Sequence, residues 1–450
     1  MAIREEDTAL ATPQVASGAK PLVGNALQLA LHPLEFLTAL PAHGDVVRVR
    51  IGPTLVYFVC SPEAVHQFLT DAQTFDKGGP VYDKGREMGG NGLLTSEYES
   101  HRRQRRLVQP AFHKERLAKY VEIMVEHTEA EIGVWRNGDV IDVNTRMSTI
   151  TNRVVTHALF SSDLVRTRAD EVGGLIEMYF DGLFWRYLDP TGLAAYLPTP
   201  TNRRYRYAVR RIHRAVDEVI DTYRATGSDH GDLLSMLMSA RDENGDRLSS
   251  DEIHDQVLTF LIAGTESTAA TLSWTLHLLS TRPGLMSRLE TEAKAVFDRG
   301  TLSWDTLPHL ALTRAVVQET LRVYPAPWLF SRIATRDAEL SGYHIPAGSS
   351  VFYSPYLIHH RPGLPEKDRE FTPDRWLGKQ ESQHARGAYI PFGGGARKCI
   401  GDEFGLAEAT VMLALIASRF RIEPVPGKPV RPVPRATLRP SRFAIHINAG

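Results

Sequence analysis

The hydrophobic positions of this chain change period along its length, which predicts a small sheet followed by a long helical region. Apolar and polar residues alternate from Val46 to Ile51, and an apolar run extends from Leu55 to Cys60 after a Gly52-Pro53 turn, so we expect two strands. Helical patterns dominate the middle of the chain, and short strand patterns return at Leu340 to Ile345 and Val351 to Tyr353. The pattern predicts a mainly α protein of the α+β class with a small β-sheet region.

The longest predicted helix begins after Ser249 and ends before Pro283. Ser249 and Glu252 have the spacing of a capping box, and apolar residues recur at helical spacing through Leu279. Its roughly 30 residues would extend on the order of 45 Å, the diameter of a domain. We therefore expect this helix to cross the core, and a last helix is predicted near Asp402 to Phe420.

One region lacks a clear hydrophobic period. Gly78 to Thr95 is rich in glycine and is long for a connection without secondary structure. We expect this segment to form a mobile loop over a binding site.

The organisation of the chain favours one large domain, although its 450 residues exceed the size at which a single core usually stops growing. No linker separates helical from strand-like segments, and the sequence contains no internal repeat. We expect a flexible N-terminal segment over residues 1–20 and a single domain over residues 21–450.

Composition and charge exclude several classes of protein. The formal net charge of -1 leaves no overall basic field for nucleic-acid binding. The first 40 residues contain no apolar stretch of roughly 18 residues, so we expect neither a membrane anchor nor a signal peptide. The two cysteines, Cys60 and Cys399, are too few for a disulfide framework and fit a reducing compartment. We expect a cytoplasmic protein.

Cys399 lies in a glycine-dense loop, Phe392 to Gly401, that leads directly into the last predicted helix. Glycines let the loop bend tightly, and its backbone N–H groups and the positive end of the following helix can stabilise a thiolate. Arg397, two residues before the sulfur, could pair with an acidic group of a bound cofactor. We interpret the loop as a thiolate site for haem iron.

Three other interpretations of this loop compete. A phosphate-binding loop requires Gly-Lys followed by Ser or Thr, whereas Lys398 follows Arg397 and precedes Cys399. A cysteine nucleophile requires a base, and His384 is only a neighbour in sequence. A structural turn around a buried thiol stays open.

Glu319 and Arg322 lie three residues apart on one face of a predicted helix. Arg375, in a later segment, could reach the same carboxylate. A surface pair of this kind contributes little, whereas a buried one is costly to break. We expect a structural role for these three residues.

Polar residues interrupt the apolar face of the longest predicted helix at Gly264, Glu266 and Ser267. The glycine would leave room for dioxygen, and the acid and the hydroxyl could relay the protons that its reduction requires. Alternatively, the hydroxyl bonds back to a carbonyl one turn earlier and the glycine marks close packing.

Together these segments resemble the cytochrome P-450 family of haem-thiolate monooxygenases over nearly the whole chain, from Pro21 to Pro440. The cysteine loop is similar to the family's haem-binding signature at Phe392, at both glycines, at Arg397 and at Cys399. The acid and two arginines described above fall where the family's Glu-Arg-Arg triad lies. The resemblance implies a single, mainly helical domain.

The resemblance also implies haem b, iron protoporphyrin IX, as the cofactor, with Cys399 as its metal ligand. A thiolate ligand favours cleavage of the O–O bond of bound dioxygen. The residues that the resemblance places on the haem propionates are His101, Arg105, Arg332 and Arg397.

Two positions depart from the family pattern. Many members have tryptophan where His101 stands, although an imidazole can also donate a hydrogen bond to a carboxylate. Ser267 replaces the usual threonine beside the acid, so we expect leakier proton delivery.

The resemblance places apolar side chains on the substrate and leaves no room in the chain for a fused redox module. We therefore expect electrons from a separate ferredoxin and its reductase, received at Arg102, Arg103 and Arg106. An apolar pocket suits a hydrocarbon or lipid-like substrate. The predicted pocket residues are Phe260, Leu261, Ala263, Trp328 and Leu329.

Several local strings look like actinobacterial family members that hydroxylate sesquiterpenes; they are His43 to Arg48, His101 to Pro110 and Glu252 to Val257. We therefore expect a monooxygenase that uses dioxygen to oxidise an apolar small molecule, such as a sesquiterpene or another terpenoid of secondary metabolism. Fatty acids, steroids and macrolides stay open as substrates. The alternative from another class is a non-catalytic carrier of haem or of an apolar ligand.

Overall fold

The protein is described from a computed structural model over residues 10–161, 169–188, 196–227, 230–362, 370–378 and 387–450. Helices dominate these residues, and the strands form sheets of six, three, two and two strands. The mainly α, α+β class predicted from the sequence is confirmed. Contacts divide the chain into a sheet unit (1–81, 329–365 and 384–398) and a helical unit (82–328, 366–383 and 399–450). Within the described ranges, no helix has the length and hydropathy that crossing a membrane requires.

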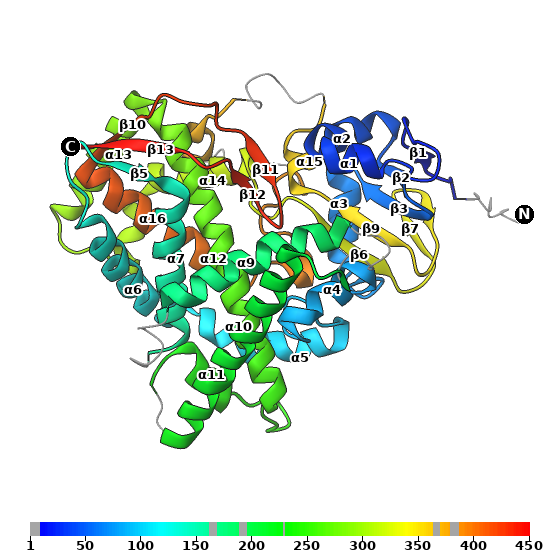
Figure 1. The fold of residues 1–450 in the computed structure, drawn as a ribbon, viewed down its shortest axis with the longest axis horizontal. Helices are drawn as coiled ribbons and strands as arrows, with labels where there is room; N and C mark the ends of the chain where they lie inside the picture. The colour runs from blue at the N-terminus through cyan, green and yellow to red at the C-terminus, as the bar shows by residue number, and fades with distance from the viewer. Residues whose placement is uncertain (1–9, 162–168, 189–195, 228–229, 363–369, 379–386) are drawn as a thin grey trace, which may run out of the picture. The chain divides into compact units, whose positions relative to one another are not determined.

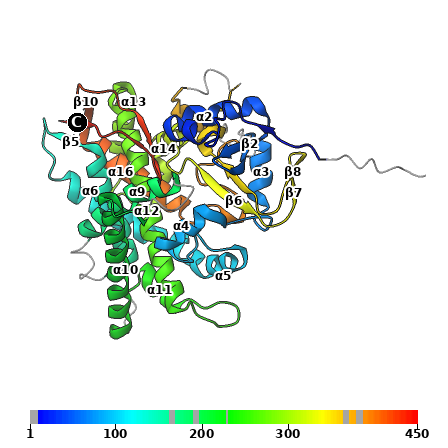
Figure 2. The same ribbon diagram turned by 45° about the vertical axis from the view of Figure 1, so that its right-hand side comes forward.

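The sheet unit is built on six strands in the order β1-β2-β3-β9-β6-β4. β2 (Val46–Ile51) and β3 (Thr54–Val59) form the hairpin that the alternation predicted, with Gly52 at φ 58° in the turn. β3 pairs in parallel with β9 (Ser350–Tyr353), so blue and yellow segments from distant parts of the chain lie side by side (Figures 1 and 2). The Phe58 and Phe352 rings stack at 5.1 Å across this pair and fix its register.

Short elements complete the sheet unit. β1 pairs in parallel with β2, so part of the N-terminal segment belongs to the sheet, while residues 1–9 lie outside the described residues. The domain boundaries at residues 20 and 21 stay a prediction. The remaining elements are β1 (Gln14–Val15), β4 (Phe75–Asp76), β6 (Phe330–Ala334), β7 (Ala338–Leu340), β8 (Tyr343–Ile345), α1 (Ala26–Leu31), α2 (Pro33–Ala39), α3 (Pro62–Thr70), α15 (Pro355–His359), η1 (Leu40–His43) and η8 (Gly395–Arg397).

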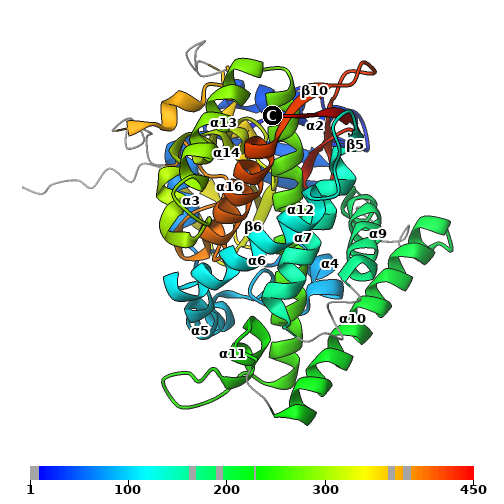
Figure 3. The same cartoon turned by 90° about the vertical axis from the view of Figure 1, so that its left-hand side faces the viewer.

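The helical unit is organised around α12 (Ser250–Ser280), the long helix that the sequence predicted. Ser249 and Glu252 form the expected capping box, which satisfies two backbone groups at the helix start. α12 is buried along most of its length and packs against α7, α10, α14 and α16, which surround it in Figure 3. It therefore forms the core of this unit.

The other elements of the helical unit follow in chain order. α4 (Gly79–Gly89) spans the boundary between the two units in sequence. The helices are α5 (Tyr98–Val108), η2 (Gln109–Phe112), α6 (Lys114–Ile132), α7 (Val143–Leu159), α9 (Ala169–Leu188), α10 (Pro200–Thr226), α11 (Leu233–Ser239), α13 (Pro283–Phe297), η4 (Trp304–His309), α14 (Ala311–Val323), η6 (Pro373–Trp376) and α16 (Asp402–Arg419). The strands are β5 (Val140–Asp142), β10 (Phe420–Pro424), β11 (Pro432–Pro434), β12 (Leu438–Pro440) and β13 (Ala444–Ala449).

Two local predictions were wrong. The glycine-rich segment expected to be a loop contains α4, which begins at Gly79, ends at Gly89 and includes Gly85 in its interior. The strand expected at Leu340 to Ile345 is the β7-β8 hairpin, whose turn places Ser341 at φ 49° and Gly342 at φ 79°. Serine at a positive φ is uncommon, so nothing in its type signalled the turn.

The Glu319 carboxylate joins α14 to η6 from a fully buried position. Arg322 donates to both of its oxygens at 2.9 and 2.8 Å, and Arg375 donates at 3.2 Å. The Trp376 indole and the Thr372 backbone N–H each donate at 2.8 Å. These contacts bring together the three residues predicted to have a structural role, and their burial makes the network costly to break.

We expect Glu319→Gln to lower the free energy of unfolding by about 3 to 5 kcal/mol, because the buried Arg322 and the partly buried Arg375 lose their counter-charge. Denaturant unfolding curves measure this difference. Glu403→Gln is the matched control, since Glu403 pairs with Arg314 at the surface and should contribute less than about 1 kcal/mol. Equal losses in the two variants would contradict the structural role of Glu319.

Candidate functional site

Cys399 lies between η8 and α16, in the loop that the sequence indicated, and its side chain is exposed. Cys60 is buried, and burial, reinforced by Asp45, raises the pKa of its thiol far above the ordinary range. Cys399 and Asp402 favour the charged form of Arg105 on α5, although burial lowers the pKa of that guanidinium overall. Cys399 therefore combines exposure with a nearby cation, the environment of a reactive thiolate.

The glycines before Cys399 shape its loop within the sheet unit. Gly393 and Gly395 have φ of 70° and 64°, a region that other residues rarely adopt. A Cβ on Gly395 would overlap the carbonyl of Leu69 in α3. The loop thus approaches α3 so closely that only glycine fits, which explains the glycine density noted in the sequence.

Buried cations gather in the sheet unit around the predicted propionate ligands Arg332 and Arg397. Arg397 hydrogen-bonds to Asp76, and Arg332 donates to the carbonyl of Phe68 at 3.1 Å. Lys77, which the sequence analysis missed, is buried beside them. Burial, Arg332 and Arg397 together hold the pKa of Lys77 well below its usual range, against the opposing effect of Asp76. A bound anion would reverse this shift.

The other predicted haem contacts are divided between the helical unit and the sheet unit. His101 is buried on α5 of the helical unit, one turn before the partly buried Arg105. Phe392 is partly buried in the sheet unit. The sheet unit thus supplies buried cations, which suit the carboxylates of a cofactor, and the helical unit supplies His101, Arg105 and the exposed sulfur of Cys399, which suit a carboxylate and a metal ion.

The centre of α12 differs from the rest of the helix in exposure. Ala263 is exposed and Gly264 is partly exposed, whereas their neighbours Leu261, Ile262 and Thr265 are buried. A methyl added at Gly264 would meet Val155 of α7 at 3.0 Å, so the glycine also permits close packing. α12 therefore offers a small, apolar surface at the point where the sequence predicted dioxygen binding.

Glu266 and Ser267 do not hydrogen-bond to each other in the contacts described; each bonds to a different residue. The Ser267 hydroxyl donates to the carbonyl of Ala263 at 2.8 Å, which is the back-bonded arrangement left open by the sequence. Thr437 donates to Glu266 Oε1 at 2.7 Å. Burial raises the pKa of Glu266 to about 7, so this carboxyl can both take up and release a proton near neutral pH.

The predicted substrate residues are apolar but differ in exposure. Phe260 packs its ring against Phe112 at 5.7 Å, and Leu261 is buried within the helical unit. Trp328 is buried and donates to the Arg435 carbonyl at 2.8 Å, while Leu329 belongs to the sheet unit and is partly exposed. Leu261 therefore serves the core more than a binding surface.

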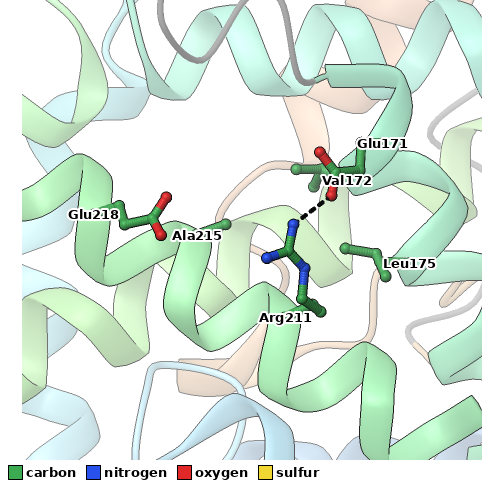
Figure 4. A pocket seen from close by; sticks show the side chains of 6 residues that line it. All are labelled: Glu171, Val172, Leu175, Arg211, Ala215 and Glu218. Atoms are coloured by element: carbon green, nitrogen blue, oxygen red, sulfur yellow. Dashed lines mark hydrogen bonds and ion pairs between the residues drawn. The ribbon is translucent and has the colours of Figure 1, made fainter.

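A shallow depression lies between α9 and α10 in Figure 4. Arg211 donates to Glu171 at 2.7 Å across it, and Glu218 adds a second carboxylate. Its charged lining does not suit an apolar ligand.

Glu408 on α16 is another buried carboxyl with a raised pKa, and the sequence analysis missed it. It is fully buried, and within the described residues neither oxygen has a hydrogen-bond partner of good geometry. Burial raises its pKa to about 8, while the nearby Thr268 hydroxyl of α12 opposes the shift. A lone acid in the apolar run Leu406 to Ile416 was the signal available in the sequence.

Comparison with known proteins agrees with the geometry. A profile of the family described as cytochrome P-450 matches residues 13–447. Cyclooctatin synthase from Streptomyces melanosporofaciens is 46% identical, with 94% of this chain and 93% of that protein covered. Cyclooctat-9-en-7-ol 5-monooxygenase from the same organism is 43% identical, with 92% and 91% covered. Pentalenene oxygenase from Streptomyces avermitilis is 42% identical, with 96% and 97% covered.

A solved structure gives the same family at the level of the fold. The crystal structure of the cytochrome P450DA haem domain superposes with a TM-score of 0.87 and 27% identity, and the match covers 98% of each chain.

We expect the stability of Glu408→Gln to depend less on pH than that of the unchanged protein. Burial raises the pKa of the Glu408 carboxyl from its ordinary value of 4.5 to about 8, so the folded protein keeps a proton that the unfolded chain releases. Stability from this group is complete at low pH and falls by roughly 1.4 kcal/mol per pH unit until pH passes the folded pKa. Denaturant unfolding curves measured from about pH 4.5 to about pH 8 compare the free energies of unfolding of the two proteins.

The exposed Glu423→Gln variant is the control for the Glu408 experiment. It should follow the pH dependence of the unchanged protein. If Glu408→Gln did the same, the carboxyl would titrate normally and the interpretation of Glu408 as a buried neutral acid would fail.

Proposed function

Because this chain belongs to the cytochrome P-450 family, we propose that it oxidises a terpenoid in the cytoplasm with electrons from a ferredoxin and its reductase. The chain is a haem-dependent monooxygenase that uses dioxygen to oxidise an apolar small molecule, so the carrier alternative is set aside. The observation that carries the substrate proposal is the identity of 42% to 46% with proteins named for cyclooctatin, cyclooctat-9-en-7-ol and pentalenene. The apolar side chains on α12 support it.

We assign the haem b contacts by motif and by the environment of each side chain. Cys399 is the proposed iron ligand. When bound, the haem supplies the site at which dioxygen is activated, and the thiolate increases the electron density there. Phe392 is placed beside the cofactor by the signature. The proposed propionate contacts are His101, Arg105, Arg332 and Arg397, and the position of Lys77 beside two of them adds it to this set.

The residues proposed to lie on the substrate side of the cofactor have three roles. Gly264 adds no side chain to this surface of the helix, where Val155 packs closely. Phe260, Ala263, Trp328 and Leu329 are the proposed residues that exclude water and contact the substrate. Glu266 holds a proton at its carboxyl near neutral pH, and Ser267 passes protons when its hydroxyl leaves the Ala263 carbonyl. The proposed order of proton transfer is solvent, Glu266, Ser267.

The docking surface that we propose for ferredoxin contains two of the three arginines that the sequence suggested. Arg103 donates to Asp242 at 2.8 Å and to Glu252 at 2.7 Å, so its charge is committed within the helical unit. Arg102 and Arg106 are exposed, and their ion pairs with Glu99 and Glu243 are also exposed. We propose these two arginines as the contacts for an acidic redox partner.

We expect the reduced, carbon monoxide-bound holoenzyme to show a strongly red-shifted Soret band that Cys399→Ser abolishes. The physical reason is loss of the thiolate ligand. Cys60→Ala is the matched cysteine control and should keep the band, since the Cys60 side chain is buried and burial disfavours its thiolate. A red-shifted band in properly folded Cys399→Ser protein would refute the ligand assignment.

Substrate screening with a surrogate ferredoxin system tests the terpenoid proposal. We expect polycyclic terpene hydrocarbons and their alcohols to shift the Soret band of the resting enzyme and to yield oxygenated products by mass spectrometry. Long-chain fatty acids, steroids and macrolactones serve as comparison substrates. Efficient oxidation of one of these classes, with no terpenoid product, would replace the proposal.

A further inference from the structure

The β11-β12 hairpin contributes a side chain to the acid of α12. Thr437, which precedes β12, is buried and donates to Glu266 Oε1 at 2.7 Å. The second oxygen, Oε2, is buried without a hydrogen-bond partner in the described part of the chain. Thr437 is therefore the group that fixes the orientation of this carboxyl.

Hydrogen bonds to backbone groups of the hairpin hold it against the rest of the helical unit. The Trp274 indole on α12 donates to the Leu438 carbonyl at 2.9 Å, and the Leu438 N–H donates to Ala326 at 2.7 Å. The Trp328 indole donates to Arg435, whose own N–H donates to the Thr437 carbonyl at 3.0 Å. These hydrogen bonds fix the backbone on both sides of Thr437 and so hold its side chain next to Glu266.

The same hairpin connects Glu266 with charges near the surface. Arg439 lies two residues after Thr437, on the same side of an extended strand. It donates to Asp181 of α9 at 3.0 Å, and more than half of the Asp181 side chain is exposed. Arg439 lowers the pKa of Glu266, whereas Asp181 and Glu177 raise it, so these surface groups act on the buried acid.

We propose that Thr437 is a positioning residue for proton delivery, because its hydroxyl holds the Glu266 carboxyl toward the hairpin, where protons enter from solvent past Arg439 and Asp181. This inference rests on the proposed role of Glu266 and adds a second element, the hairpin, to it. Loading of the acid takes place at the hairpin, and delivery to Ser267 requires the carboxyl to leave Thr437. The Thr437 hydroxyl thereby sets when Glu266 is loaded.

Thr437→Val removes the hydroxyl and keeps the shape of the side chain. The ionised carboxylate then loses its hydrogen-bond donor, so the titration midpoint of Glu266 should rise by about one pH unit. Thr437→Ser keeps the donor and should restore the original midpoint. Thr437→Ala is a second variant without the hydroxyl, for use if the valine disturbs the hairpin.

Infrared spectroscopy of the substrate-free holoenzyme measures this midpoint from the carbonyl band of the protonated carboxyl. The measurement is made in a Glu408→Gln background, because Glu408 is also buried and has a raised pKa. The band that disappears in Glu266→Gln is the band of Glu266. We expect a midpoint near 7 that moves up in Thr437→Val and Thr437→Ala and stays in Thr437→Ser. An unmoved midpoint in both variants that lack the hydroxyl would overturn the inference.

A second readout separates positioning from simple structural support. The fraction of reducing equivalents that ends in product, measured against pH, should shift with the infrared midpoint in Thr437→Val, while the carbon monoxide spectrum stays unchanged. A uniform loss at every pH would instead indicate a structural role and refute positioning. Because the infrared experiment contains no substrate, failure of the terpenoid proposal leaves its outcome intact.

Discussion

A polar group on a buried helix is stabilised by a hydrogen-bond partner, and α12, which is buried along most of its length, places this demand on the helical unit. Five of its hydroxyls find a partner by bonding back one turn: Thr265 to Leu261, Ser267 to Ala263, Thr271 to Ser267, Ser273 to Ala269 and Thr275 to Thr271. An ionised carboxylate has no hydrogen to donate to a carbonyl, and Glu266 accepts a hydrogen bond from Thr437 of the hairpin instead. The chemistry of the helix therefore depends on elements distant in sequence.

Much of the fold could be predicted because local signals were strong. The capping box at Ser249, the alternation in β2 and the apolar period of α12 and α16 each required only neighbouring residues. α4 was missed because glycine carries a low helix propensity, which packing can override. The β7-β8 turn was missed because Ser341 adopts a conformation that its residue type disfavours.

Site residues that belong to a contiguous sequence motif could be predicted. Residues whose partners lie on distant elements could not. The loop of Cys399 and the Glu319 network could be inferred from spacing and family resemblance. Lys77, Glu408 and Thr437 act through neighbours on other elements, so the sequence alone gave no pairing for them. Burial, which sets the pKa of Lys77 and Glu408, becomes visible only in three dimensions.

The departure at Ser267 has a kinetic meaning for the hydroxyl bound to the Ala263 carbonyl. Threonine carries a γ-methyl group that restricts rotation about χ1 in a helix, whereas serine lacks that methyl. The Ser267 hydroxyl is therefore a nearly unhindered rotor, and turning it inward costs one hydrogen bond and no steric clash with its own side chain. In the proposed proton route, the step at Ser267 would therefore need the rotation of a single bond and no movement of the helix.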